Sequence, residues 1–328
     1  MTRYVLKRIG QAALVLWAAY TVTFAILYLL PGDPVALMLS ANNIEVDSLT
    51  PQEREVAAAR LGLDRPLWAQ YLGMLGAALR GDFGVSFAKG IPVTELLAQR
   101  LPGTLTLSVI AIVLALVIGV AIAFLATWLP RGRLADLLRR VPAVGVSVPN
   151  FWIGLLLIQV FAFTLGWFPA MGSEGWQSLV LPAVTMAIPT AAVLAQVLTR
   201  SFDDTLGEAY IATARAKGLS RFAVQVRHAF RNAALPTLTI LGLLVGATVT
   251  GSIVVETVFS RNGVGRLAQE SVLAQDIPVV QAIVVLAAAA FVVVNLIVDL
   301  LYPLLDPRIA RTAKARTPNA RTPNVSRA

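Results

Sequence analysis

The sequence predicts an all-α, polytopic membrane protein with six transmembrane helices and with both ends of the chain in the cytoplasm. Three observations lead to it: the composition, the length of the uncharged segments and the placement of the basic residues. The 328 residues are 57% hydrophobic and only 14% charged, whereas an average soluble domain has about 25% charged residues. A soluble protein would need more charge to cover its surface, and a surface that faces lipid does not.

Six segments lack Asp, Glu, Lys, Arg and His over a length that crosses a bilayer, which takes about 20 helical residues. They cover 9–30, 104–129, 141–166, 179–199, 233–255 and 277–298. A backbone in lipid has to satisfy its own hydrogen bonds, so each segment is expected to be a helix. Pro189 lies inside the fourth segment and predicts a kink there.

The basic residues set the orientation. Nineteen of the 27 Lys and Arg residues lie before the first segment, in the second and fourth connections, or after the sixth segment. Six of the other eight lie in one long loop, and long loops cross the membrane with little regard to charge. Both termini are therefore expected to be cytoplasmic. The net charge of +9 then indicates topology and contact with anionic lipid rather than nucleic acid.

The chain divides into four parts on this basis. Residues 1–30 form the cytoplasmic N-terminus and the first span, 31–103 an extracytoplasmic loop, and 104–303 a core of five spans. Residues 304–328 form a basic cytoplasmic tail, which is expected to be disordered because it is of low complexity and repeats Ala-Arg-Thr-Pro-Asn.

Two helices are expected in the extracytoplasmic loop, on the outer face of the membrane. Thr50-Pro51-Gln52-Glu53 is a typical helix start. A second, amphipathic stretch follows Pro66 and places Leu67, Tyr71, Leu75 and Leu79 on roughly one face. Two interpretations stay open: a structural cap over the mouth of a pore, or a docking surface for a protein that delivers substrate.

The cytoplasmic loop over residues 200–235 is long and has a helical pattern. A short helix is expected from Leu206 to Lys217, with Gly218 as a left-handed stop, and Ser220 is expected to cap a second helix. The alanines of the first helix would allow close approach to a groove in a partner. The alternative is a basic helix that rests on anionic headgroups.

At this loop the sequence resembles importer permeases of the oligopeptide, dipeptide and nickel branch of ABC transporters. The segments Glu208–Ser220 and Arg227–Pro236 are very similar to the signature of that branch. Further family-like segments are Leu30–Pro34, Gly81–Ser86, Val148–Trp152, Val255–Phe259 and Leu304–Arg308. Two departures are mild: Ala212-Thr213-Ala214 stands where other importer branches have Glu-Ala-Ala, and Asn262 stands where Pro is common.

The resemblance implies the architecture of a type I ABC importer in a bacterial plasma (inner) membrane. It implies a homologous permease as partner, with a heterodimer expected, two cytoplasmic ATPases that use ATP and Mg, and an extracytoplasmic substrate-binding protein. It also implies that the helix around 208–219 seats in the ATPase. The residues carried over to that role are Glu208, Ala209, Tyr210, Ala212, Thr213, Ala214, Arg215, Ala216, Lys217, Gly218 and Leu219.

The chain itself is not expected to be an enzyme or to bind a cofactor. It contains no Gly-Lys pair and therefore no phosphate-binding loop of the Gly-Lys-Ser/Thr type. With one histidine, His228, and no cysteine, it has no zinc constellation. ATP hydrolysis is accordingly assigned to the partner subunits.

A few polar side chains fall inside or near the expected spans, where such residues often line a pathway. The pathway-lining candidates are Gln159, Gln196, Glu256 and Asn295, with Asp299 a weaker one. Glu256 and Asp299 could equally lie near an interface and reach water. Gly242 and Gly246 form a close-packing pair that faces either a sister subunit or another span of this chain.

The alternative function is an ion-coupled secondary transporter. Such a protein would show paired intramembrane charges, broken helices and internal repeats, and none is evident in the sequence. The substrate stays open among dipeptides, oligopeptides, nickel chelates, glutathione, opines and haem, because the binding protein supplies most of the selectivity in importers of this kind.

Overall fold

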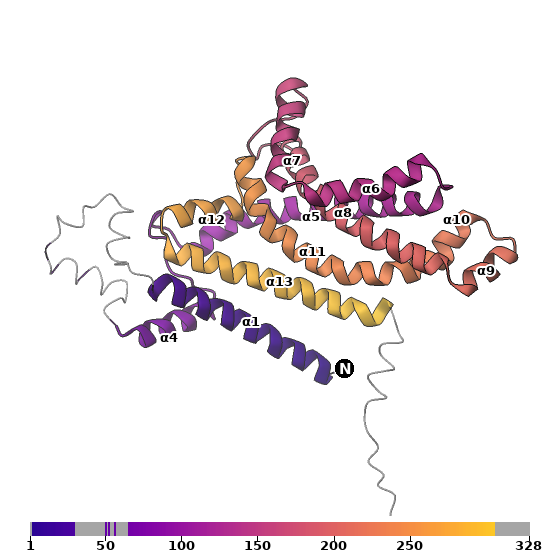
Figure 1. Ribbon diagram of the computed structural model, residues 1–328. Coiled ribbons are helices and arrows are strands. Elements are labelled where there is room, and N and C mark those ends of the chain that lie inside the picture. Colours follow the sequence, from indigo (N-terminus) through magenta and orange to yellow (C-terminus); the bar gives the residue numbers. More distant parts are fainter. Residues whose placement is uncertain (1, 30–49, 51, 53–55, 57–64, 306–328) are drawn as a thin grey trace, which may run out of the picture.

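The computed structural model describes residues 2–29, 50, 52, 56 and 65–305, and this part of the chain is a bundle of long helices with short helices at both ends (Figure 1). The expected helix start at 50–53 and the tail beyond residue 305 lie largely outside the described residues. Within the described ranges, strand pairing is limited to one isolated bridge between Val85 and Pro92.

Five long helices are apolar enough to cross a membrane. They are α1 (Thr2–Leu29), α5 (Val93–Trp128), α8 (Gln177–Leu206), α11 (Phe230–Val258) and α13 (Ile277–Leu305). They correspond to the first, second, fourth, fifth and sixth of the expected spans. α8 continues as one helix through Pro189, so the proline does not break the span, and the kink stays a prediction.

The third expected span differs from the prediction. α6 (Arg133–Ser147) and the helical run of α7 (Asn150–Leu157) and η2 (Ile158–Thr164) meet at an angle of 104°. The prediction of one continuous helix over 141–166 is therefore wrong, and a sixth span exists only if this bent pair counts as one. The cause is Pro149, which disfavours helical geometry in the residue before it. Val148 is accordingly extended, with φ −93° and ψ 128°.

α8 is the central helix of the bundle. Its most apolar window is 67% buried, against 17% for that of α1, and it packs against α5, α6, α7 and α11. Small residues bring α5 and α8 together: a Cβ added at Gly119 would lie 3.0 Å from the carbonyl oxygen of Ala191. Close helix approach through small residues is typical of packing inside membranes.

The short helices lie at opposite ends of the bundle (Figure 1). At one end, α9 (Ala209–Ala216), α10 (Arg221–Ala223) and the π-helical turn η3 (Val224–Ala229) connect α8 to α11. The N-terminus of α1 and the C-terminal end of α13 lie at this same end, which we name the α9 end. At the other end lie α4 (Leu67–Ala78) and α12 (Val264–Leu273).

Candidate functional site

α9 is a compact helix that begins and ends at defined backbone breaks. The chain leaves α8 at Leu206, and Glu208 is extended, with ψ 148°. The helix is therefore shorter than the predicted range of 206–217. It ends at Ala216, and the φ of +81° at Gly218 confirms the left-handed stop. The backbone N–H of Gly218 donates to the carbonyl of Arg215 at 2.9 Å.

One face of α9 is anchored in the bundle. Ile211 and Ala214 are buried in a cluster with Leu198 and Phe202 of α8 and with Val224 of η3. Ala214 was among the residues predicted to seat in an ATPase, and in the structure its side chain is buried against this chain. Leu219 is half-buried beside the same cluster.

The opposite face of α9 is open. Its exposed residues are Glu208, Ala209, Tyr210, Ala212, Thr213, Arg215, Ala216, Lys217 and Gly218. The alanines of this face would allow a partner to approach the helix closely. Arg215 and Lys217 could reach acidic groups of that partner. The face contains all the residues predicted to seat in an ATPase except Ala214 and Leu219, and the seating itself stays a prediction.

The hydroxyl of Tyr210 connects α9 to η3 and to the start of α11. It accepts a hydrogen bond from Nδ2 of Asn232 at 2.8 Å and donates one to the backbone carbonyl of His228 at 3.2 Å. Asn232 lies in the first turn of α11. The tyrosine therefore links α9 to the start of α11 directly, in addition to the connection through the chain.

The second helix of the loop is capped as predicted. The backbone N–H of Ala223 donates to Oγ of Ser220 at 3.2 Å. Sequence reasoning missed Gln225, which is buried in η3 and donates from Nε2 to Oγ1 of Thr127 at 2.7 Å and to the carbonyl of Phe124 at 3.0 Å. These bonds tie the loop to the end of α5.

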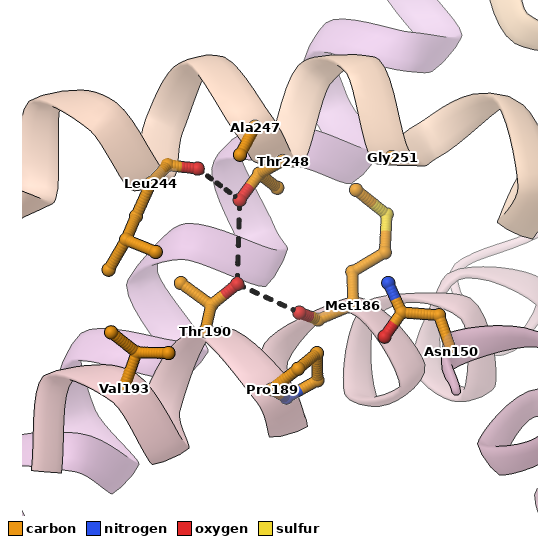
Figure 2. A pocket seen from close by; sticks show the side chains of 9 residues that line it. All are labelled: Asn150, Met186, Pro189, Thr190, Val193, Leu244, Ala247, Thr248 and Gly251. Carbon is orange, nitrogen blue, oxygen red and sulfur yellow. Dashed lines mark hydrogen bonds between the residues drawn. The ribbon is translucent and has the colours of Figure 1, made fainter. Parts of the chain in front are cut away.

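A cavity of about 180 Å³ lies between α8 and α11, beside the start of α7. Figure 2 shows Thr190 and Thr248 facing each other across the two helices, with their hydroxyls 3.5 Å apart. Each hydroxyl also donates to a carbonyl of its own helix. Among the described residues, Asn150 makes no side-chain hydrogen bond, and its amide faces this cavity. The rest of the lining is Met186, Pro189, Val193, Leu244, Ala247 and Gly251.

None of the predicted pathway residues lines this cavity. Gln159 on η2 and Gln196 on α8 are exposed, and the amide of Asn295 on α13 donates to the carbonyl of Phe291 in its own helix at 2.8 Å. Glu256 has no exposed surface. Hydrogen bonds between the described residues join no two of these four, and the side chain of Asp299 lies outside the described part.

The comparisons with known proteins agree with this geometry. Residues 115–311 match the family described as "Binding-protein-dependent transport system inner membrane component", and residues 1–108 match the N-terminal family of the same system. The chain belongs to this family. It is a subunit of a bacterial ABC importer, a binding-protein-dependent permease that crosses the inner membrane several times. The family implies ATPase and substrate-binding protein partners and a subunit that is not itself catalytic.

One curated relative and two solved structures are similar to this chain. The permease is 40% identical over 311 residues to "Glutathione transport system permease protein GsiC" of Escherichia coli K12, covering 94% of this chain and 99% of that one. An inward-facing MetNI methionine ABC transporter is similar with a TM-score of 0.56 and 15% identity, covering 64% of this chain and 96% of that one. An amino acid ABC transporter solved with histidines gives a TM-score of 0.52 and 18% identity, covering 64% and 94%. The last two show the fold alone.

We name the end of the bundle that carries α4 and α12 the α12 end. There, Glu256 of α11 connects α5 and α12. Its Oε1 accepts a hydrogen bond from the Thr104 hydroxyl of α5 at 2.7 Å, and its Oε2 accepts the backbone N–H of Gly265 at 2.7 Å. Thr104 in turn accepts the N–H of Val264 at 2.8 Å. The carboxylate therefore caps the start of α12, and neither water nor lipid headgroups reach it in this chain.

Two further buried charged residues brace the same end, and sequence reasoning missed both. Arg261 donates to the carbonyl of Ser178 at 2.7 Å and to that of Gly172 at 3.3 Å. Burial lowers the pKa of Arg261, and the nearby carboxylate of Glu256 raises it in part. Asp276 accepts the backbone N–H groups of Phe87 and Ala88 and the hydroxyl of Ser86.

Proposed function

We propose that this permease pairs with a homologous subunit and imports peptides or peptide-like solutes such as glutathione, with α9 seated in a partner ATPase. The α9 end, with both termini, is then cytoplasmic. The observation that carries the coupling role is the contrast between the two faces of α9. Ile211, Ala214 and Tyr210 fix the helix to α8 and α11, while the small and cationic face stays open.

α9 is connected to two membrane-spanning helices, α8 and α11. α9 follows α8 after a two-residue break and joins α11 through η3, and Tyr210 adds a direct hydrogen bond. ATP binding shifts the permease between states only through contacts that differ between them. Closure of the ATPases on α9 would supply such contacts, and α8 and α11 would then move relative to each other.

We further propose that the cavity between α8 and α11 is where this subunit contacts the solute. It lies between the two helices that α9 connects, so its shape depends on their relative position. Among the residues that the structure describes, no charged side chain lines it, which favours an uncharged part of the solute. The amide of Asn150 can both donate to and accept from a peptide bond. The hydroxyl oxygens of Thr190 and Thr248, whose protons go to carbonyls of their own helices, can accept from the N–H of that bond.

The coupling role is tested with Ala212→Trp, which places a large side chain on the open face of α9. The matched control is Ala98→Trp, at an exposed alanine near the start of α5. In the complete reconstituted transporter, Ala212→Trp is expected to lose both ATPase co-purification and stimulation by loaded binding protein, and Ala98→Trp to keep both. Normal stimulation in Ala212→Trp would contradict the proposal.

The solute contact is tested separately with Asn150→Leu and glutathione-loaded binding protein. Uptake into proteoliposomes is expected to fall while ATPase assembly stays intact. The comparisons give no support to the alternative function, an ion-coupled secondary transporter, although the bent pair of α6 and α7 is a broken helix of the kind that it would show. That alternative predicts that the chain purifies alone, whereas an importer subunit brings down a sister permease and two ATPases.

A further inference from the structure

α4 has an unusual distribution of polarity for a helix in an extracytoplasmic loop. Its sequence, LWAQYLGMLGAA, contains no charged residue. Its two side chains with strong hydrogen-bonding groups point inwards. Gln70 is only 8% exposed and donates to the carbonyl of Arg65 at 2.7 Å, and the hydroxyl of Tyr71 lies 2.8 Å from that of Thr21 on α1.

The outward face of α4 is apolar. Trp68, Leu72 and the C-cap residue Leu79 are 68%, 57% and 81% exposed. Their spacing of four and seven residues places them on one face of the helix. A helix on a water-exposed surface has its polar face outside and its apolar face inside. α4 has the reverse arrangement, which suits a surface that faces hydrocarbon.

The contacts of Tyr71 give the depth of α4. Its ring centre lies 6.1 Å from that of Tyr20 and 5.3 Å from that of Phe24, both inside the apolar span Arg8–Leu27 of α1. At 1.5 Å per residue, Thr21 lies about 20 Å along the helix from Arg8, in a hydrocarbon core about 30 Å thick. With Arg8 taken as one edge of the hydrocarbon and α1 as parallel to the membrane normal, the Tyr71 hydroxyl lies about 10 Å below the surface at the C-terminal end of α1.

The flanks of α4 set its orientation. Arg65 precedes the helix, and Arg80 and Asp82 follow it; all are exposed. Charged residues at both ends favour a helix whose ends stay at the polar boundary, with long basic side chains reaching the headgroups. Figure 1 shows α4 beside the C-terminal half of α1, where α1 itself exposes Val22 and Ile26. The exposed apolar surface of α4 and that of α1 therefore lie at a similar depth along the bundle.

We propose that α4 lies in the membrane leaflet at the C-terminal end of α1, with Trp68, Leu72 and Leu79 among the lipid acyl chains. This assigns lipid as the partner of α4, in place of a cap over the pore mouth or a docking surface for a binding protein. A buried depth of about 5–10 Å is typical of apolar faces of interfacial helices. The proposal rests on α4 and α1 alone and does not depend on the substrate or on the coupling role.

The absence of cysteine from the sequence permits a direct test in the complete transporter, reconstituted in lipid nanodiscs. Leu72→Cys is spin-labelled and compared with two controls: Val22→Cys on the exposed apolar side of α1, and Glu174→Cys in the loop before α8, where a charged residue is exposed. Collisions of each label with oxygen, which is enriched in hydrocarbon, and with a water-soluble nickel chelate are measured.

The label at Leu72→Cys is expected to match Val22→Cys, with frequent collisions with oxygen and loss of access to the chelate. Access to the chelate equal to that at Glu174→Cys would show a water-exposed cap and overturn the proposal. An immobilised label reached by neither reagent would show that a protein subunit covers α4, and would overturn it too. Added binding protein should change none of the three labels; protection of Leu72→Cys alone would show a docking surface.

Discussion

The carboxylate of Glu256 accepts the backbone N–H of Gly265 at 2.7 Å, although the two residues lie on different helices and Glu256 has no exposed surface. A Cβ at Gly265 would lie 2.9 Å from that carboxylate and would collide with the backbone of Ile253. The position therefore accepts only glycine, and the start of α12 is held against α11 by a buried charge.

The first prediction concerns this cap. Glu256→Ala leaves the Thr104 hydroxyl and the Gly265 N–H without their acceptor in a buried place, which costs about 1–3 kcal/mol for each such group. The melting temperature of the purified permease should fall clearly. The control is Glu174→Ala, at an exposed carboxylate, which should leave melting unchanged. Equal melting of both variants would show that the cap does not contribute to stability.

The second prediction concerns the contact of α11 with α13. A Cβ at Gly246 would lie 2.5 Å from Cδ2 of Phe291, so Gly246→Ala forces the ring to move. Overpacking of this kind costs about 1–3 kcal/mol, which lowers the melting temperature. Gly10→Ala is the control, because nothing lies within 4 Å of a Cβ there. The double variant Gly246→Ala/Phe291→Leu should recover part of the loss; no recovery would place the cost elsewhere.

The third prediction concerns the hydrogen bonds of Tyr210, which connect α9 to η3 and α11. Tyr210→Phe removes the hydrogen bonds to Asn232 and to the carbonyl of His228, with a net loss of about 1 kcal/mol. Amide hydrogen exchange in α9 should become faster while the rest of the bundle is unchanged. If α9 couples to an ATPase, stimulation by binding protein should fall without loss of ATPase binding. Unchanged exchange in α9 would show that Ile211 and Ala214 anchor it sufficiently.

The fourth prediction is a pH dependence at the α12 end. Partial burial raises the pKa of Glu270, but the hydrogen bond from Lys89 at 3.3 Å and the charges of Lys89, Arg100 and Arg266 outweigh it and hold the pKa below its ordinary value. A lowered carboxyl pKa contributes stability that is present above the ordinary value and is lost as pH falls through the lowered one.

The size of this effect is small, because the ion pair is partly exposed and is screened by salt. Exposed pairs contribute about 0–1 kcal/mol. Melting of the wild-type permease should therefore decline slightly more between pH 6 and pH 3 than that of Glu270→Gln, and the difference should shrink in high salt. Parallel curves for the two proteins would contradict the assignment.

The sequence was sufficient for most spans because hydropathy depends on the solvent and not on tertiary detail. A window of apolar residues cannot report a change of direction, however. The bend at Pro149 was missed because the segment over 141–166 is apolar on both sides of it, while α6 extends back to the charged residue Arg133. Pro149 lies between the two helices of the bent pair.

The candidate site was predictable in part, for a similar reason. Gly218 and Ser220 act through local backbone chemistry, and both behave as predicted. Which face of α9 is buried depends on Phe202 and Val224, which reach it only in the folded bundle, and so the sequence did not indicate that Ala214 is buried. The cavity residues Thr190 and Thr248 are 58 residues apart, and no local pattern joins them.

Because α8 is long, a tilt of this helix would displace its α9 end and the cavity by different distances. Pro189 borders the cavity, and the helix runs from there to Leu206, a distance of about 25 Å at 1.5 Å per residue. Were α8 to tilt by about 10° around that point, its far end would swing by about 4 Å while the cavity wall would hardly move. In such a tilt, a displacement of about 4 Å at the α9 end of the helix would accompany a much smaller displacement around Thr190.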